Sequence, residues 1–183
     1  MMEFVYAYAY FVLYAFLGWV CEDLYCGIPA KKFINRGFFY GPYCPIYGVG
    51  ALLVLYPLLF VKDYPILVFV LGVIITSALE YITSWVMDIL FKTRWWNYSE
   101  RFMNINGRVC LLNSTLFGIM SIVVVYIIHP VIQDIVMDIP FTALMSFLSA
   151  FTIGFGIDCV FTVLALLRRK QVFQKVQVQM EAF

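Results

Sequence analysis

The stretch that decides the fold class is ILVFVLGVIITSALEYITSWVMDIL, residues 66–90, whose only charged residues are Glu80 and Asp88. A helix needs about 20 apolar residues to cross a hydrocarbon core about 30 Å thick, and this run is longer than that. Inside a bilayer the backbone polar groups must be paired within the segment, which a helix achieves. The stretch therefore predicts a transmembrane helix.

The composition of the whole chain indicates the same environment. Of its 183 residues, 64% are apolar or aromatic and 13% are charged. The charged share is half of the roughly 25% that is usual in soluble domains, so lipid must be the main solvent. The net charge of +1 carries no signature of nucleic-acid binding. We therefore expect the lipid bilayer as a partner and no nucleic acid.

Five apolar runs predict transmembrane helices, at about residues 4–21, 46–61, 66–90, 109–128 and 141–167. Between the first two, residues 33–48 are rich in Gly, Pro and aromatic residues. Pro42 and Pro45 forbid a continuous helix there, and the aromatic side chains disfavour full exposure to water, so we expect a re-entrant or interfacial segment. The predicted fold class is all-α, a polytopic membrane helical bundle. It forms a single transmembrane domain over residues 1–170, and residues 171–183 form a tail.

The basic residues predict the orientation of this bundle. In the five-helix arrangement, 11 of the 12 Lys and Arg residues fall on one side and only Lys62 on the other. Lys and Arg near helix ends resist translocation, so the basic side is expected to be cytoplasmic. The N-terminus is then outside, and the C-terminal tail is cytoplasmic.

Buried acids are the candidate functional residues, because an ionised side chain inside the bilayer is costly and therefore usually functional. Glu80 lies in the middle of the third predicted helix, with Ser77, Ser84 and Asp88 on the same helical face. Arg36 and Arg108 enter from the basic side and would balance the acids. We predict a polar pocket open to the cytoplasm, formed by Glu22, Arg36, Glu80, Ser84, Asn106, Arg108 and Asp158. The alternative is that these charges only tie helices together.

The loop before the fourth predicted helix is a candidate docking surface for a partner. It contains Trp95, Trp96, Tyr98 and Asn104, followed directly by Asn106 and Arg108. Anchoring at the membrane interface is an alternative role for the two tryptophans.

Several chemistries have no support in the sequence. It has no GxxxxGK[ST] phosphate loop, no HExxH pair and no GxSxG elbow, and its one histidine is His129. Its five cysteines contain no CxxC pair, so we expect no metal and no cofactor. The sequence yields no catalytic residue, and it favours a protein that is not an enzyme.

Four blocks of the chain carry a family resemblance. They are residues 33–38 with 41–48, Gly18-Trp19 with Glu22, Leu79-Glu80-Tyr81 with Ser84, and residues 96–99 with 104–111. In these blocks the chain resembles the bacterial CmpB-type family, described as ABC transporters of type IV. The resemblance implies a permease of the bacterial cell membrane that works with a separate ATPase.

Three functions remain open from the sequence. The first is a membrane transport component, an ABC-type permease lacking its own ATPase, for a small-molecule substrate that the sequence does not identify. The second is a membrane-embedded enzyme or a lipid-headgroup-binding protein, with Arg36 and Arg108 on the phosphate. The third is a non-catalytic assembly subunit. Small residues on the later helices also allow a homo-oligomer.

Overall fold

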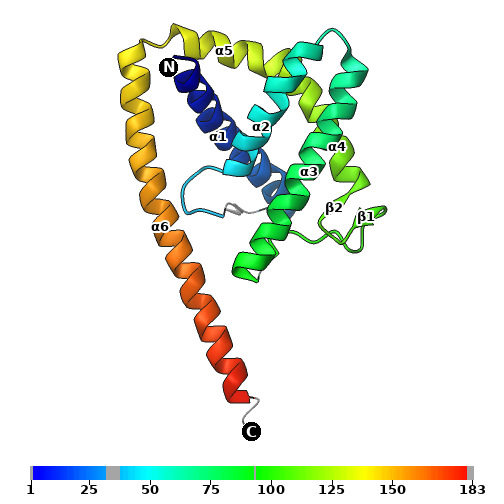
Figure 1. Ribbon diagram of the computed structural model, residues 1–183, viewed down its shortest axis with the longest axis vertical. Helices are drawn as coiled ribbons and strands as arrows, with labels where there is room; N and C mark the ends of the chain where they lie inside the picture. The colour runs from blue at the N-terminus through cyan, green and yellow to red at the C-terminus, as the bar shows by residue number, and fades with distance from the viewer. Residues whose placement is uncertain (1, 32–37, 93, 181–183) are drawn as a thin grey trace.

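The computed structural model describes residues 2–31, 38–92 and 94–180, and its chain is mostly helical (Figure 1). In chain order its elements are α1 (Met2–Ala30), α2 (Pro45–Leu58), η1 (Leu59–Val61), α3 (Pro65–Phe91), β1 (Asn104–Ile105), β2 (Val109–Cys110), α4 (Leu111–Val123), η2 (Val124–Ile128), α5 (His129–Asp138) and α6 (Phe141–Met180). Here η1 is a 3₁₀ turn and η2 is a π-helical turn.

The described residues contain four helical stretches that are long and apolar enough to cross a membrane, at 2–24, 65–91, 111–138 and 141–168. Pro45–Val61 is a fifth, shorter apolar helix. In Figure 1 the chain alternates in direction through α1, α2, α3 and α4, then crosses the top as α5 and descends as α6. This arrangement confirms the prediction of an all-α polytopic membrane bundle.

The fourth apolar run differs from its predicted bounds of 109–128 at both ends. Val109 and Cys110 form strand β2, so the helix begins at Leu111. At the other end the chain stays helical through η2 and α5 to Asp138. Pro130 does not stop the helix because it lies in the first turn of α5, where its missing N–H is not needed. The π-helical turn comes where the chain changes direction, and α5 lies across the end of the bundle (Figure 1).

A short hairpin precedes α4. Strands β1 and β2 are antiparallel, with Asn104 opposite Cys110 and Ile105 opposite Val109. The turn between them contains Asn106 and Gly107, with φ of 52° and 68°. Asn-Gly is the pair that tight hairpin turns with two positive φ angles favour. This dipeptide was the sequence signal for a hairpin, which the predicted helix start at residue 109 overlooked.

Glycines allow the helices to approach closely. A Cβ atom added at Gly48 of α2 would lie 2.5 Å from the backbone oxygen of Phe11 in α1. A Cβ at Gly72 of α3 would lie 2.6 Å from the Ser121 side chain of α4. At these distances no residue larger than glycine fits, so α1 packs tightly on α2 and α3 packs tightly on α4.

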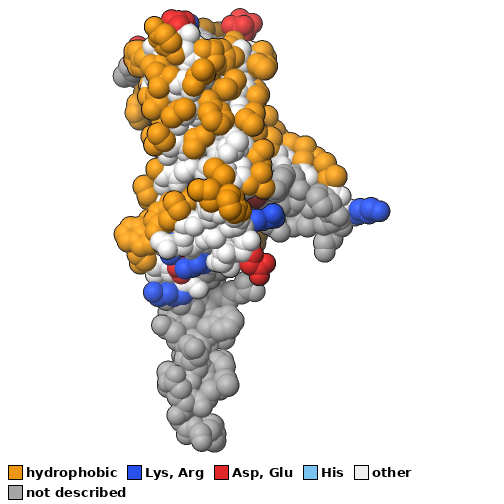
Figure 2. All heavy atoms as spheres, turned by 90° about the vertical axis from the view of Figure 1, so that its right-hand side faces the viewer, with side chains coloured by type: hydrophobic (Ala, Val, Ile, Leu, Met, Phe, Trp, Pro, Cys, Tyr) orange, Lys and Arg blue, Asp and Glu red, His pale blue; other side chains and the backbone are white. Residues whose placement is uncertain are grey.

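Apolar surface covers the outside of the bundle as well as its core. Leu58, Val68 and Val136 are fully buried and belong to one core cluster that α1, α2, α3, α5 and α6 share. Figure 2 shows a broad band of exposed hydrophobic side chains, with acidic groups at its top and Lys and Arg side chains below it. Of the four long apolar stretches, the one in α6 is the least covered by the rest of the protein, with 6% of the residues in its most apolar part buried. Such a surface suits lipid rather than water.

Candidate functional site

The polar face predicted for the third helix points toward α4 and the segment before it. Ser77 donates a hydrogen bond to Ser114 of α4 at 2.7 Å. One turn further, Glu80 accepts a hydrogen bond from Tyr98. Arg108 binds the last two residues of the stripe, Ser84 and Asp88. These polar side chains of α3 therefore find partners on one neighbouring face, as their helical spacing predicts.

Glu80 is the most enclosed acid of this stripe, with 6% of its surface exposed. The Tyr98 hydroxyl donates to Glu80 Oε1 at 3.1 Å and accepts a hydrogen bond from Asn113 Nδ2 at 2.6 Å. Glu80 Oε2 is buried and has no hydrogen-bond partner among the described residues. A buried polar atom in this state is unusual, which makes Glu80 the candidate centre of the site.

Glu22 joins the same cluster from α1. The Tyr47 hydroxyl of α2 donates to Glu22 Oε2 at 2.5 Å. Burial raises the pKa of the Tyr98 hydroxyl, and its hydrogen bond to Glu80 raises it further. Tyr98 therefore stays protonated and serves as a donor. We call Glu22, Tyr47, Glu80, Tyr98 and Asn113 the acid–tyrosine cluster.

Arg108 forms a second cluster, next along the same face of α3. Its guanidinium donates to Asp88 Oδ2 at 2.8 Å and to Ser84 Oγ at 3.2 Å, and it lies over the Tyr81 ring at 5.8 Å. Asp88 also pairs with Arg94 at 3.3 Å. Arg108 is 7% exposed, so its charge is neutralised locally by Asp88. The structure thus pairs Arg108 with Asp88 rather than with Glu80.

Three of the four predicted docking residues, Trp96, Tyr98 and Asn104, form hydrogen bonds within the protein. The fourth, Trp95, packs against other aromatic rings of the protein. The Trp96 ring nitrogen donates to the Arg108 carbonyl at 2.8 Å, and Trp95 contacts the rings of Phe38 and Phe91. Asn104 donates to the carbonyls of Ser99 and Arg101. Asn106, predicted for the pocket, donates to the Tyr81 hydroxyl at 2.9 Å.

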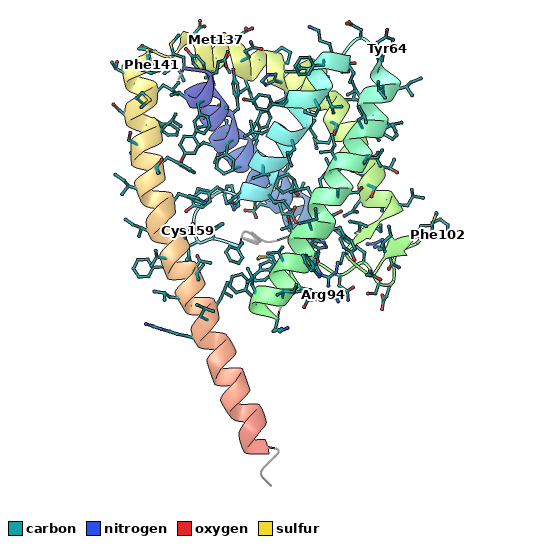
Figure 3. All side chains as sticks on the ribbon, viewed as in Figure 1. Tyr64, Arg94, Phe102, Met137, Phe141 and Cys159 are labelled. Atoms are coloured by element: carbon teal, nitrogen blue, oxygen red, sulfur yellow. The ribbon has the colours of Figure 1, made fainter. Side chains whose placement is uncertain are left out.

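The most exposed apolar side chains of this loop lie at its tip. Phe102, Met103 and Ile105 are 78%, 64% and 60% exposed. Figure 3 shows Phe102 pointing away from the bundle. The docking prediction for the loop remains a prediction, and these tip residues are where a partner would find free surface.

Asp158 lies in a separate place, against the non-helical segment before α2. Its carboxylate accepts hydrogen bonds from the backbone N–H groups of Tyr40 and Gly41 and from the hydroxyls of Tyr43 and Thr162. A groove of about 520 Å³ beside it is lined by Gly154, Ile157, Phe161, Leu164 and Arg168 among others. Asp158 therefore attaches α6 to residues 40–43 and does not join the acid–tyrosine cluster. Arg36 lies outside the described residues.

We expect Asp158→Ala to loosen this attachment. The amides of Tyr40 and Gly41 would lose their acceptor, so their hydrogen exchange should quicken roughly tenfold. Ser146→Ala is the matched control, because the Ser146 hydroxyl donates to the Thr142 carbonyl within its own helix. Exchange measured by mass spectrometry in nanodiscs checks this, and unchanged rates at both amides in Asp158→Ala would contradict the role assigned to Asp158.

Within the described ranges, no group of three or more His, Cys, Asp or Glu side chains could hold a metal ion. The fold and the clusters define the class of this protein: a polytopic membrane protein with buried acids close to a loop that carries Arg94, Arg101 and Arg108.

The chain belongs to the family described as "Putative ABC-transporter type IV", whose model matches residues 9–163. This match confirms the family resemblance found in the sequence blocks. No curated protein and no solved structure matches the chain.

Proposed function

We propose that this protein is an integral membrane transport component, an ABC-type permease that works with a separate ATPase. Its ligand would bind at a polar pocket that opens to the cytoplasm and centres on Glu80. The observation that carries the proposal is the buried Glu80 Oε2, which no described group satisfies, together with Tyr98 on Oε1. Membership of a family named for ABC transporters supports the same reading.

The contacts of Tyr98 suggest how a partner could act on this pocket. Tyr98 belongs to the loop between α3 and α4, and its hydroxyl contacts both Glu80 of α3 and Asn113 of α4. A partner that moved this loop would therefore change the donors around Glu80. Since the sequence has no phosphate loop, the ATPase would be a separate subunit that docks on residues 94–108.

We propose the bacterial cell membrane as the location, with the N-terminus outside and the C-terminus cytoplasmic. In Figure 3 Tyr64, beside Lys62, and Arg94 lie at opposite ends of the bundle. Arg94, Arg101 and Arg108 all belong to the loop at the second end, which the positive-inside rule assigns to the cytoplasm.

Reporter fusions test this orientation. Alkaline phosphatase folds only outside the cytoplasm, so a fusion after Asp63 should be active and a fusion after Arg101 or at the C-terminus inactive. A fluorescent protein that folds only inside the cytoplasm serves as the control and should give the opposite pattern. An active phosphatase after Arg101 would exclude the proposed orientation.

The transport role is tested in two ways. Purification in mild detergent should recover an ATPase subunit. After reconstitution, the wild-type chain should stimulate the activity of this ATPase, and the Glu80→Gln chain should not. Glu3→Gln, which changes an exposed acid outside the docking loop, is the control. If a folded Glu80→Gln variant still stimulates the ATPase, Glu80 is not part of the ligand pocket.

One observation favours the third function, an assembly subunit without its own ligand. The pair of Arg108 and Asp88 joins the hairpin to α3 and has the form of a purely structural tie. If Glu80→Gln and Arg108→Ala leave cellular function intact and only lower thermal stability, this alternative holds and the pocket assignment fails. The lipid-headgroup alternative is weakened at Arg108, whose guanidinium is already paired with Asp88.

A further inference from the structure

We propose that Glu80 binds one exchangeable proton at neutral pH. This deepens the proposed function, since it names the proton as the ion bound at the Glu80 pocket. The proposal itself rests on the geometry of the acid–tyrosine cluster and not on the transport role.

The first observation is a charge that nothing described balances. Glu80 is 94% removed from solvent, and its Oε2 has no partner among the described residues. The ion pairs that the structure describes are those of Asp88 with Arg94 and Arg108, so the nearest guanidinium on this face is already used. Burial disfavours the charged form of a carboxyl group that no cation balances, so Glu80 favours its protonated form.

The second observation is that the groups facing the acids are neutral donors. Tyr47 of α2 donates to Glu22, Tyr98 donates to Glu80, and Asn113 of α4 donates to Tyr98. Among the described residues, the other titratable groups near the cluster are Asp23 of α1, Cys44 before α2 and Cys110 of β2. None of these described groups is cationic, so none of them neutralises Glu80.

A proton fits this site better than a metal ion does. The cluster offers two carboxylates, from Glu22 and Glu80, and two phenols, from Tyr47 and Tyr98. Among the described residues, no group of three or more His, Cys, Asp or Glu side chains could hold a metal ion. With Oε1 already accepting from Tyr98, the free Oε2 is the atom that would carry the proton. Glu22 is only half buried, so it offers the route by which the proton exchanges with the cytoplasmic side.

Infrared spectroscopy of the purified full chain in nanodiscs tests the proposal directly. A buried protonated carboxylic acid gives a separate carbonyl band that shifts in deuterated water. We expect this band at neutral pH in the wild type and in Glu100→Gln, and its loss in Glu80→Gln. Tyr98→Phe should keep the band but shift its frequency, because the hydrogen bond to Oε1 is lost.

Three results would overturn the proposal: no such band at neutral pH in the folded wild type, a band that persists in Glu80→Gln, or a band that falls with added Na⁺ or K⁺ at fixed pH. The first would mean that a basic side chain, for which Arg36 is the candidate in the sequence, neutralises the acids. The proposed function is tested separately. If the band is present but neither an ATPase partner nor transport is found, the transport function is wrong and the proton site is still supported.

Discussion

Gly48→Leu is expected to separate α1 from α2 and to leave little folded protein in mild detergent. A Cβ atom at this position would already lie 2.5 Å from the Phe11 carbonyl oxygen and 2.7 Å from its ring. A backbone oxygen cannot rotate away as a side chain can, so the two helices would have to move apart. Overpacking a close contact costs about 1 to 3 kcal/mol even for a few methylenes, and leucine adds four carbons.

Gly154→Leu supplies the matched control for this prediction. Among the described residues, no atom beyond the chain neighbours and nearby backbone of its own helix lies within 4 Å of a Cβ built at Gly154 of α6, so the same substitution meets open space there. Its folded yield, measured by size-exclusion chromatography with fluorescence detection, should stay near that of the wild type. Equal losses in the two variants would show that the close approach of α1 and α2 does not limit stability.

Arg108→Ala is expected to lower the free energy of unfolding by about 1.5 to 3 kcal/mol, the range for hydrogen bonds to charged groups. The guanidinium is 7% exposed and binds both Ser84 and Asp88 while it covers the Tyr81 ring. Its removal leaves Asp88 with Arg94 alone, at a longer distance of 3.3 Å. The hairpin would also lose its main polar attachment to α3.

Unfolding in mixed micelles with increasing SDS, followed by tryptophan fluorescence, measures this loss. Arg101→Ala is the control, because Arg101 is exposed on the same loop and should change stability by no more than about 0.5 kcal/mol. Combining Arg108→Ala with Asp88→Asn should cost less than the two separate changes together, since both disrupt one ion pair. Additive losses would mean that the two residues stabilise the protein independently.

Part of the site could be predicted from the sequence because helical spacing is a local property. The positions of Ser77, Glu80, Ser84 and Asp88 place them on one face, and the structure finds their partners on one side. The apolar pattern also revealed the long helices. The hairpin was missed although Asn106-Gly107 signals it, because Val109 and Cys110 continue smoothly into an apolar run.

The partners of these side chains could not be predicted in the same way. Tyr98 was expected to face a docking partner, and instead its hydroxyl reaches Glu80 across 18 positions of sequence. Tyr47 and Asn113 could not be assigned, since a buried hydroxyl or amide needs a partner but the sequence does not show which group supplies it. Asp158 was expected in the same pocket as Glu80, but its donors are the backbone amides of Tyr40 and Gly41.

The sequence by itself determined the lipid environment, the helical class, the charge asymmetry and the polar face of α3, because each follows from composition or from the regular spacing of neighbouring residues. Only the tertiary structure decided that Arg108 neutralises Asp88, that Asp158 attaches α6, and that Glu22 and Glu80 each accept a hydrogen bond from a tyrosine hydroxyl. The reason is physical. Which acid meets which base depends on how separate helices approach and turn toward one another, and that is fixed by close contacts such as Gly48 on Phe11 that no local pattern encodes.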